Sequence, residues 1–136
     1  MEKKERIRYF YETVVSKHRL EELPAFISAD CVIRAGTDVI PLGVDGMRQH
    51  LISIRNTYPD YTMQIIRQFA DGDDVISEFI MTGTHRGDFL GITPTNKVIS
   101  ITGVDIDKII DGKIVEHGGA ANTFDAFWEH HLIQPV

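Results

Sequence analysis

The spacing of apolar residues changes at Pro59, and this change limits the fold more than any other feature of the sequence. Before Pro59, the first apolar residues recur at the spacing of one helix face: Ile7, Phe10, Tyr11, Val14 and Val15. After Pro59, apolar and polar residues alternate, as in half-buried strands. Helices followed by a run of antiparallel strands predict an α+β fold, in which the helices cover one face of a curved sheet that can enclose a pocket.

The same patterns predict the individual elements. Beyond the first helix we expect helices at 20–27 and 44–57, with Pro24 in the first turn of the former and a loop through Pro41 and Gly43 before the latter. Strands are expected at 30–35, 61–69, 75–86, 98–109 and 113–123, with a loop at 87–97 and a closing helix at 124–132. The length of 136 residues suits a single domain, residues 1–136.

Charge and composition exclude several classes of function. Fourteen Lys and Arg residues against twenty Asp and Glu give a net charge of −6, which argues against binding to nucleic acid or to an anionic membrane. No apolar run is long enough to span a membrane, and the N-terminus lacks an apolar signal core, so we expect a cytoplasmic protein. Cys31 is the only cysteine, which excludes an internal disulfide.

The hairpin around Asp111-Gly112 carries the best candidates for chemistry, and its register decides which side chains meet. A two-residue loop would place Asp107 opposite Glu116, where like charges repel. A three-residue loop, Ile110–Gly112, would instead place Asp105 opposite His117 and Gly103 opposite Gly119. We favour the second register. It predicts a carboxylate beside an imidazole, a pair suited to general acid–base catalysis, although such pairs also occur as purely structural contacts.

Further residues are candidates for the lining of a pocket. Small residues inside strands can mark the close approach of a ligand or of another element, and five of them fall in this hairpin: Gly103, Gly118, Gly119, Ala120 and Ala121. Tyr11 lies on the apolar stripe of the first helix, and His85 shares a strand face with Phe79 and Met81. The acidic residues and histidines lack the ligand spacing of known metal sites, so we expect neither a metal nor another cofactor.

The residues from Thr82 to Lys97 resemble the signature loop of the SnoaL-like polyketide cyclases, also called the ester cyclase family. The segments 103–109 and 111–117 resemble the same family, and weaker matches extend over nearly the whole chain. The resemblance implies the cone-shaped roll of the nuclear-transport-factor-2-like superfamily, in which N-terminal helices pack on a strongly curved antiparallel sheet around a pocket. It also implies a homodimer formed through the sheet, and a cofactor-free aldol cyclisation in true cyclases.

This sequence departs from the family pattern at the residues that carry the reaction. The family commonly reads His-Trp-Asp where this chain reads His117-Gly118-Gly119, so that its catalytic aspartate is replaced by Gly119. A second common aspartate corresponds to Asn122, and a histidine of the first strand corresponds to Arg34. The usual cyclase reaction is therefore not expected.

Three hypotheses remain open from the sequence. In the first, Asp105 and His117 form a relocated acid–base pair that acts on a small hydrophobic carbonyl-type or epoxide substrate, with Tyr11, Arg34, His85, Gly103, Gly119 and Asn122 binding it. In the second, the cone binds a small hydrophobic ligand without catalysis. In the third, the chain is a structural dimer whose pocket is filled by Phe127 or Trp128. Burying a polar floor without function is costly, which disfavours the third.

Overall fold

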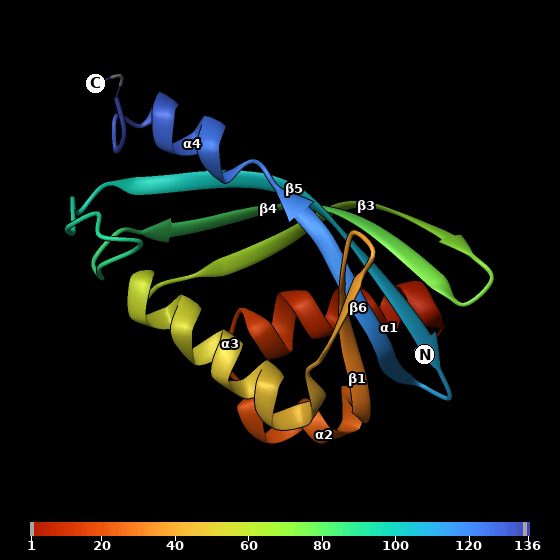
Figure 1. The fold of residues 1–136 in the computed structure, drawn as a ribbon. Coiled ribbons are helices and arrows are strands. Elements are labelled where there is room, and N and C mark those ends of the chain that lie inside the picture. Colours follow the sequence, from red (N-terminus) through yellow and green to blue (C-terminus); the bar gives the residue numbers. More distant parts are fainter. Residues whose placement is uncertain (1, 135) are drawn as a thin grey trace.

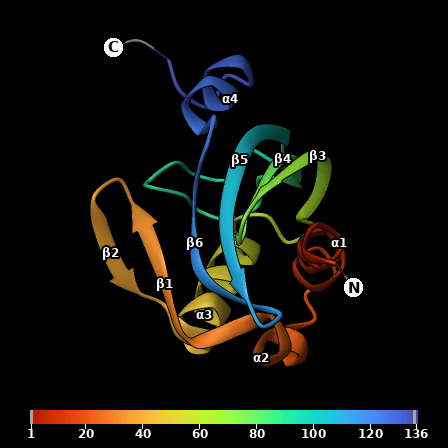
Figure 2. The same cartoon turned by 90° about the vertical axis from the view of Figure 1, so that its right-hand side faces the viewer.

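A six-stranded sheet with helices packed inside its curve forms the core of the computed structural model, which describes residues 2–134 and 136. The strand order is β2-β1-β6-β5-β4-β3. The strands are β1 (Ile27–Ala35), β2 (Asp38–Pro41), β3 (Thr62–Asp71), β4 (Asp74–Thr84), β5 (Val98–Ile110) and β6 (Lys113–Ala121). Figure 1 shows the helices α1, α2 and α3 below this sheet, and Figure 2 shows how strongly the strands coil around them. The predicted α+β cone with an enclosed pocket is confirmed.

The chain is helical from Lys3 to Val15, but its winding changes on the way. Helix α1 (Lys3–Tyr9) continues into η1 (Phe10–Val15), where the backbone N–H of Ser16 donates to the carbonyl of Tyr11 five residues earlier. This wider π-helical winding is frequent at functional sites. The apolar stripe predicted for this segment is buried as expected, including Ile7 and Phe10.

Three further helical segments complete the fold. A short turn η2 (Leu20–Glu22) leads into α2 (Leu23–Phe26), which has Pro24 in its first turn as predicted. Helix α3 (Gly43–Thr57) follows β2 and buries Met47 and Leu51. Helix α4 (Thr123–Glu129) lies at the end of β6, buries Phe127, and leaves Phe124 and Trp128 stacked on each other and exposed. The hypothesis that Trp128 folds inward and fills the pocket is therefore wrong.

Two features of the sheet differ from the sequence prediction. The segment expected as a loop before α3 contains β2, which pairs with β1 as a short hairpin. Strand β1 then pairs in parallel with β6, with Ile33 beside His117, so the sheet is mixed rather than wholly antiparallel. This parallel pairing places β1 at the side of β6, and it decides which way Arg34 faces.

The predicted register of the β5–β6 hairpin is wrong. The turn is the two-residue loop Asp111-Gly112, with φ angles of 52° and 79°. A bulge after Lys108 then shifts the pairing, so that Asp107 faces His117 and Asp105 faces Gly119. The bulge leaves Val115 of β6 without a partner on β5, so the pairing differs from both registers considered for the sequence.

Candidate active site

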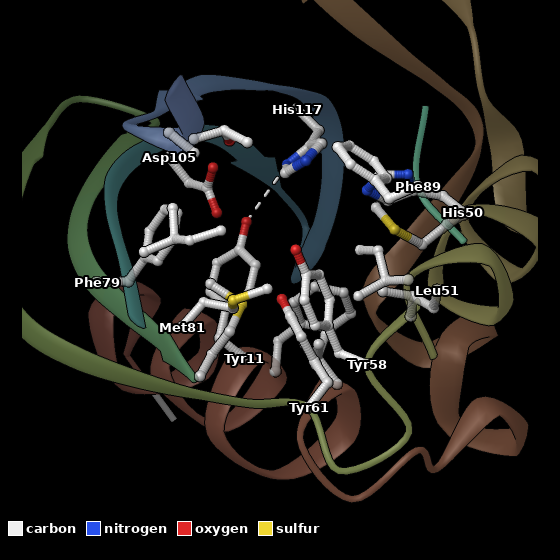
Figure 3. Close-up of a pocket in the computed structure, with 18 residues that line it drawn as sticks. Tyr11, His50, Leu51, Tyr58, Tyr61, Phe79, Met81, Phe89, Asp105 and His117 are labelled. Carbon is white, nitrogen blue, oxygen red and sulfur yellow. Dashed lines mark hydrogen bonds between the residues drawn. The ribbon is translucent and has the colours of Figure 1, made fainter. Parts of the chain in front are cut away.

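The concave side of the sheet and the helices enclose a cavity of about 290 Å³, which lies at the lower end of the range for small-molecule sites. Its walls are largely apolar and come from η1, α3, strands β3 to β6 and the loop between β4 and β5: Phe10, Val15, Met47, Leu51, Ile54, Met63, Phe79, Met81, Phe89, Ile101 and Ala121. The polar residues on its walls are Tyr11, His50, Tyr58, Tyr61, Asp105, His117 and Thr123. Figure 3 shows most of these side chains converging on the same space.

Two of these polar side chains, Tyr11 and His117, form a hydrogen-bonded cluster with Asp107 behind one wall. The Tyr11 hydroxyl donates to Oδ2 of Asp107 at 2.6 Å, and Nδ1 of His117 donates to Oδ1 of the same carboxylate at 2.7 Å. The Tyr11 oxygen also lies 3.3 Å from Nδ1 of His117. Asp107 is fully buried, and both carboxylate oxygens are used, so this residue fixes the orientation of Tyr11 and His117.

Electrostatics favour the charged form of His117. Burial opposes its protonation, but the hydrogen bond and charge of Asp107, together with the charge of Asp105, raise its pKa to about 9. Burial and the nearby carboxylates raise the pKa of Tyr11 well above its usual value, so its hydroxyl stays neutral and donates. The cluster therefore presents a cationic imidazole to the cavity at neutral pH.

Asp105 lies two residues before Asp107 on the same strand face and points into the cavity (Figure 3). The Tyr11 hydroxyl, which donates its short hydrogen bond to Asp107, also lies close enough to this carboxylate to favour its ionised form. Burial raises its pKa from 3.8 to about 7; the charge of His117 opposes this rise and the charge of Asp107 adds to it. A carboxyl group that titrates near neutrality can both accept and return a proton.

Gly119 makes room for this carboxylate. It has a φ angle of +145°, and a Cβ atom there would lie 2.2 Å from the carbonyl oxygen of Val104 and 2.8 Å from Oδ1 of Asp105. Any side chain at this position would compete with Asp105 for the same space. The observed position of the Asp105 carboxylate on β5 therefore requires a glycine at position 119 on β6.

Asp105, His117 and Tyr11 are brought together in the cavity as predicted, but other predicted residues lie elsewhere. Arg34 faces the outer side of the sheet, where it pairs with Glu116 at 2.6 Å. Asn122 is exposed and donates to Oγ1 of Thr102. Both were expected to contact a substrate, and neither lines the cavity: Arg34 lies on the outer side of β1, and Asn122 lies beyond the end of β6.

The predicted pocket roles of His85 and Gly103 are also not supported by their positions. His85 is completely buried beside Tyr58, and its Nδ1 contacts Oγ1 of Thr95 at 3.0 Å within the loop that follows β4. Gly103 accommodates Phe79, because a Cβ there would lie 2.5 Å from the ring. Both residues therefore contact side chains that line the cavity, Tyr58 and Phe79, and do not line it themselves.

Sequence reasoning missed two parts of the site. Asp107 had been considered only as a like-charge neighbour of Glu116, although its alternation with Asp105 already placed both on one face. Tyr58 and Tyr61 flank Pro59, and their spacing around a turn gave no indication of direction. His50 lies at the rim of the cavity, where burial and the charge of His117 lower its pKa.

Among residues 2–134 and 136, no group of three His, Cys, Asp or Glu side chains could hold a metal ion. No helix in that part of the chain is long and apolar enough to cross a membrane.

Comparisons with known proteins agree with this architecture. The family model for SnoaL-like polyketide cyclases matches residues 5–128. No curated protein matches the sequence. A solved structure of IdmH, a candidate polyketide cyclase from Streptomyces antibioticus, is 25% identical, with a TM-score of 0.79 over 93% of this chain and 96% of that one.

Two other solved structures show the same fold. A candidate polyketide cyclase from Acidithiobacillus ferrooxidans is 22% identical, with a TM-score of 0.81 and coverage of 94% of this chain and 93% of its own. AclR, a candidate hydroxylase from Streptomyces galilaeus, is 22% identical, with a TM-score of 0.80 and coverage of 96% and 98%.

Proposed function

Since the chain belongs to the SnoaL-like polyketide cyclase family, we propose that it catalyses cofactor-free proton transfer on a small hydrophobic carbonyl compound, with Asp105 as the acid–base group. One observation carries the proposal: the Asp105 carboxyl lies in a largely apolar cavity, where burial raises its pKa to about 7. An acid or base with a pKa near the working pH is the most effective in this role.

The proposed reaction begins with the ionised form of Asp105. Its carboxylate accepts a proton from the carbon next to the substrate carbonyl, and the electrons of the broken C–H bond pass to the carbonyl oxygen as an enolate. The cationic His117, oriented by Asp107, stabilises this negative charge. The enolate carbon then either takes the proton back from Asp105, or attacks a second carbonyl carbon within the substrate, whose oxygen accepts the electron pair and then the proton of Asp105. In both cases Asp105 returns to its ionised form.

Asp105 would thereby replace the aspartate that the family commonly carries at the position of Gly119. The geometry supports this exchange, because a side chain at 119 would occupy the space that Oδ1 of Asp105 now fills. The two positions face each other across β5 and β6, although Gly119 itself does not line the cavity.

The test is hydrogen–deuterium exchange next to the carbonyl group of small ketones, followed by NMR in D₂O. We expect Asp105→Asn to reduce exchange by about 100-fold or more, the usual contribution of general acid–base catalysis. The matched control is Asp71→Asn, which neutralises an exposed carboxylate at the end of β3. Equal exchange by the wild type and Asp105→Asn would refute the proposal.

A second candidate function is ligand binding without catalysis, which the mainly apolar lining of the cavity favours. In that case ketones would bind and raise the thermal stability of the protein, but their exchange rate would not depend on Asp105.

We also propose that the outer face of the sheet forms a contact with a second copy of the chain. This face exposes large apolar side chains on β3 and β5, which would be costly to leave in water: Ile66, Phe69, Val104, Ile106 and Ile110. Light scattering after gel filtration would test this proposal, and a mass of 15.4 kDa at micromolar concentration would refute it.

A further inference from the structure

The turn Tyr58-Pro59-Asp60-Tyr61 directs two phenol rings into the cavity. Both rings are almost completely buried, at 5% and 6% exposure, and both line the cavity. In Figure 3 their hydroxyl groups point toward the centre of the cavity, on the other side from Asp105.

The two hydroxyl groups have no hydrogen-bond partner in the described part of the chain, unlike the other two tyrosines. Tyr9 donates to Glu22 at 2.8 Å, and Tyr11 donates to Asp107 at 2.6 Å. Neither hydroxyl oxygen is among the fully buried polar atoms that lack a partner, so both are open to the space inside the cavity. The hydroxyls of Tyr58 and Tyr61 are therefore available to a ligand.

The surrounding contacts hold this turn in place. The Tyr61 N–H donates to the Tyr58 carbonyl at 3.0 Å, and Asp60 accepts two hydrogen bonds of 2.6 Å from the backbone and side chain of Thr84. Arg55 donates to the carbonyl of Pro59 at 3.0 Å, and its guanidinium lies over the Tyr61 ring. Gly83 leaves space for Tyr58, because a Cβ there would lie 2.7 Å from the Cβ of that residue.

The protonation state of the pair suits donation. Burial raises the pKa of Tyr58, and burial with the charge of Asp105 raises that of Tyr61 far more. Both groups therefore stay neutral in the presence of an acceptor oxygen. A rigid pair of neutral donors costs little reorganisation when an oxygen binds.

We propose that the Tyr58 and Tyr61 hydroxyls form a paired donor site that binds a ligand oxygen across the cavity from Asp105, and so selects ligands that carry a carbonyl group. This inference rests on the proposed function: the tyrosine pair holds the substrate carbonyl oxygen by hydrogen bonds, while the charge of His117 stabilises the enolate that forms when Asp105 removes the neighbouring proton.

The test compares ketones with hydrocarbons of the same shape. The probes are 1-tetralone with tetralin, 1-indanone with indane, and cyclohexyl methyl ketone with ethylcyclohexane, titrated into labelled protein and followed by NMR. Two new hydrogen bonds should make at least one ketone bind about tenfold tighter than its hydrocarbon. The preference should fall toward one in the double variant Tyr58→Phe/Tyr61→Phe.

Tyr9→Phe is the matched control, since it removes a tyrosine hydroxyl outside the cavity and should leave the preference unchanged. Thermal unfolding separates binding from a structural role. Removing two hydroxyls that face the cavity and have no partner within the protein should leave the melting temperature unchanged or higher, whereas a clear decrease would mean that they bond within the protein. The inference is overturned by that decrease, by an unchanged ketone preference in the double variant, or by the absence of any preference in the wild type.

The same probes distinguish this inference from the proposed function. Asp105→Asn should abolish exchange but keep the ketone preference, because both tyrosines remain. Exchange that does not depend on Asp105 would refute the catalytic role alone. A preference that does not depend on Tyr58 and Tyr61 would refute the donor site alone.

Discussion

Replacing Asp105 by Asn should stabilise the protein by an amount that grows with pH. The folded state raises the pKa of this carboxyl from 3.8 to about 7 through burial. Below the lower value the group is protonated in both states, and the full stability is present. As the pH rises toward 7, only the unfolded chain ionises freely, so wild-type stability is lost until the folded group ionises as well.

The size of the effect follows from the two pKa values. Each unit of difference corresponds to about 1.4 kcal/mol, so ionisation of Asp105 costs the wild type about 4 kcal/mol above pH 7 and about 1.6 kcal/mol at pH 5. Asparagine does not titrate. The advantage of the variant should therefore be about 2.5 kcal/mol larger at pH 8 than at pH 5. The pKa of about 7 already includes the attraction of His117 for the ionised carboxylate.

Urea unfolding followed by far-ultraviolet circular dichroism measures this difference directly. The wild type, Asp105→Asn and the control Asp71→Asn would each be unfolded at pH 5 and pH 8. The control neutralises an exposed carboxylate, so its stability relative to the wild type should be the same at both pH values. A variant that is no more stabilised at pH 8 than at pH 5, or that is less stable than the wild type at pH 8, would refute the reasoning.

Four further predictions follow from the site and the sheet. Ketone exchange should rise as Asp105 ionises near pH 7 and fall as His117 loses its proton near pH 9, in a pH–rate profile. Gly119→Ala should lower stability by about 2 kcal/mol in urea unfolding, because of its positive φ angle and its contacts. Asp107→Asn should lower the pKa of His117 in an NMR titration, since a neutral partner no longer favours the imidazolium. Ile106→Glu should yield a monomer in light scattering, since it places a charge on the outer sheet face.

Each of these has a control or a contrary outcome. Gly36→Ala tests conformational strain alone, because Gly36 has a φ angle of +64° and no atom within 4 Å of an added Cβ; an equal loss in both alanine variants would contradict the steric argument. Gln49→Glu adds the same single negative charge at an exposed position of α3, away from the outer sheet face, and should leave the mass unchanged. A flat pH–rate profile or an unchanged His117 pKa would count against the assigned roles.

Much of the fold could be predicted because periodicity reports local burial. The stripe containing Ile7 and Phe10 predicted the first helix, and alternation after Pro59 predicted the four long strands. The hairpin register could not be predicted in the same way. The turn contains two residues, but the bulge after Lys108 arises where the coiled strands close around the core, and no local sequence signal marks it.

The candidate site was partly predictable for the same reason. Asp105 and His117 both reach the cavity because both lie on the inner face of the sheet, even though the two residues do not pair with each other. Arg34 was misplaced because its direction depends on the parallel pairing of β1 with β6, a contact between segments far apart in the sequence. Tyr58 and Tyr61 were missed because a turn, unlike a strand, has no alternation that indicates where side chains point.

The position of Trp128 determines what intrinsic fluorescence can report. It is the only tryptophan in the chain, it stacks on Phe124, and it lies half-exposed on α4 at the end of β6. Its emission therefore monitors the attachment of the C-terminal helix, whereas circular dichroism monitors the sheet and the helices within its curve. On the other side of α4, Phe127 packs edge-to-face on Phe89 of the cavity wall. A fluorescence transition that precedes the dichroism transition would thus reveal a partly open state in which this wall has lost its support while the sheet remains folded.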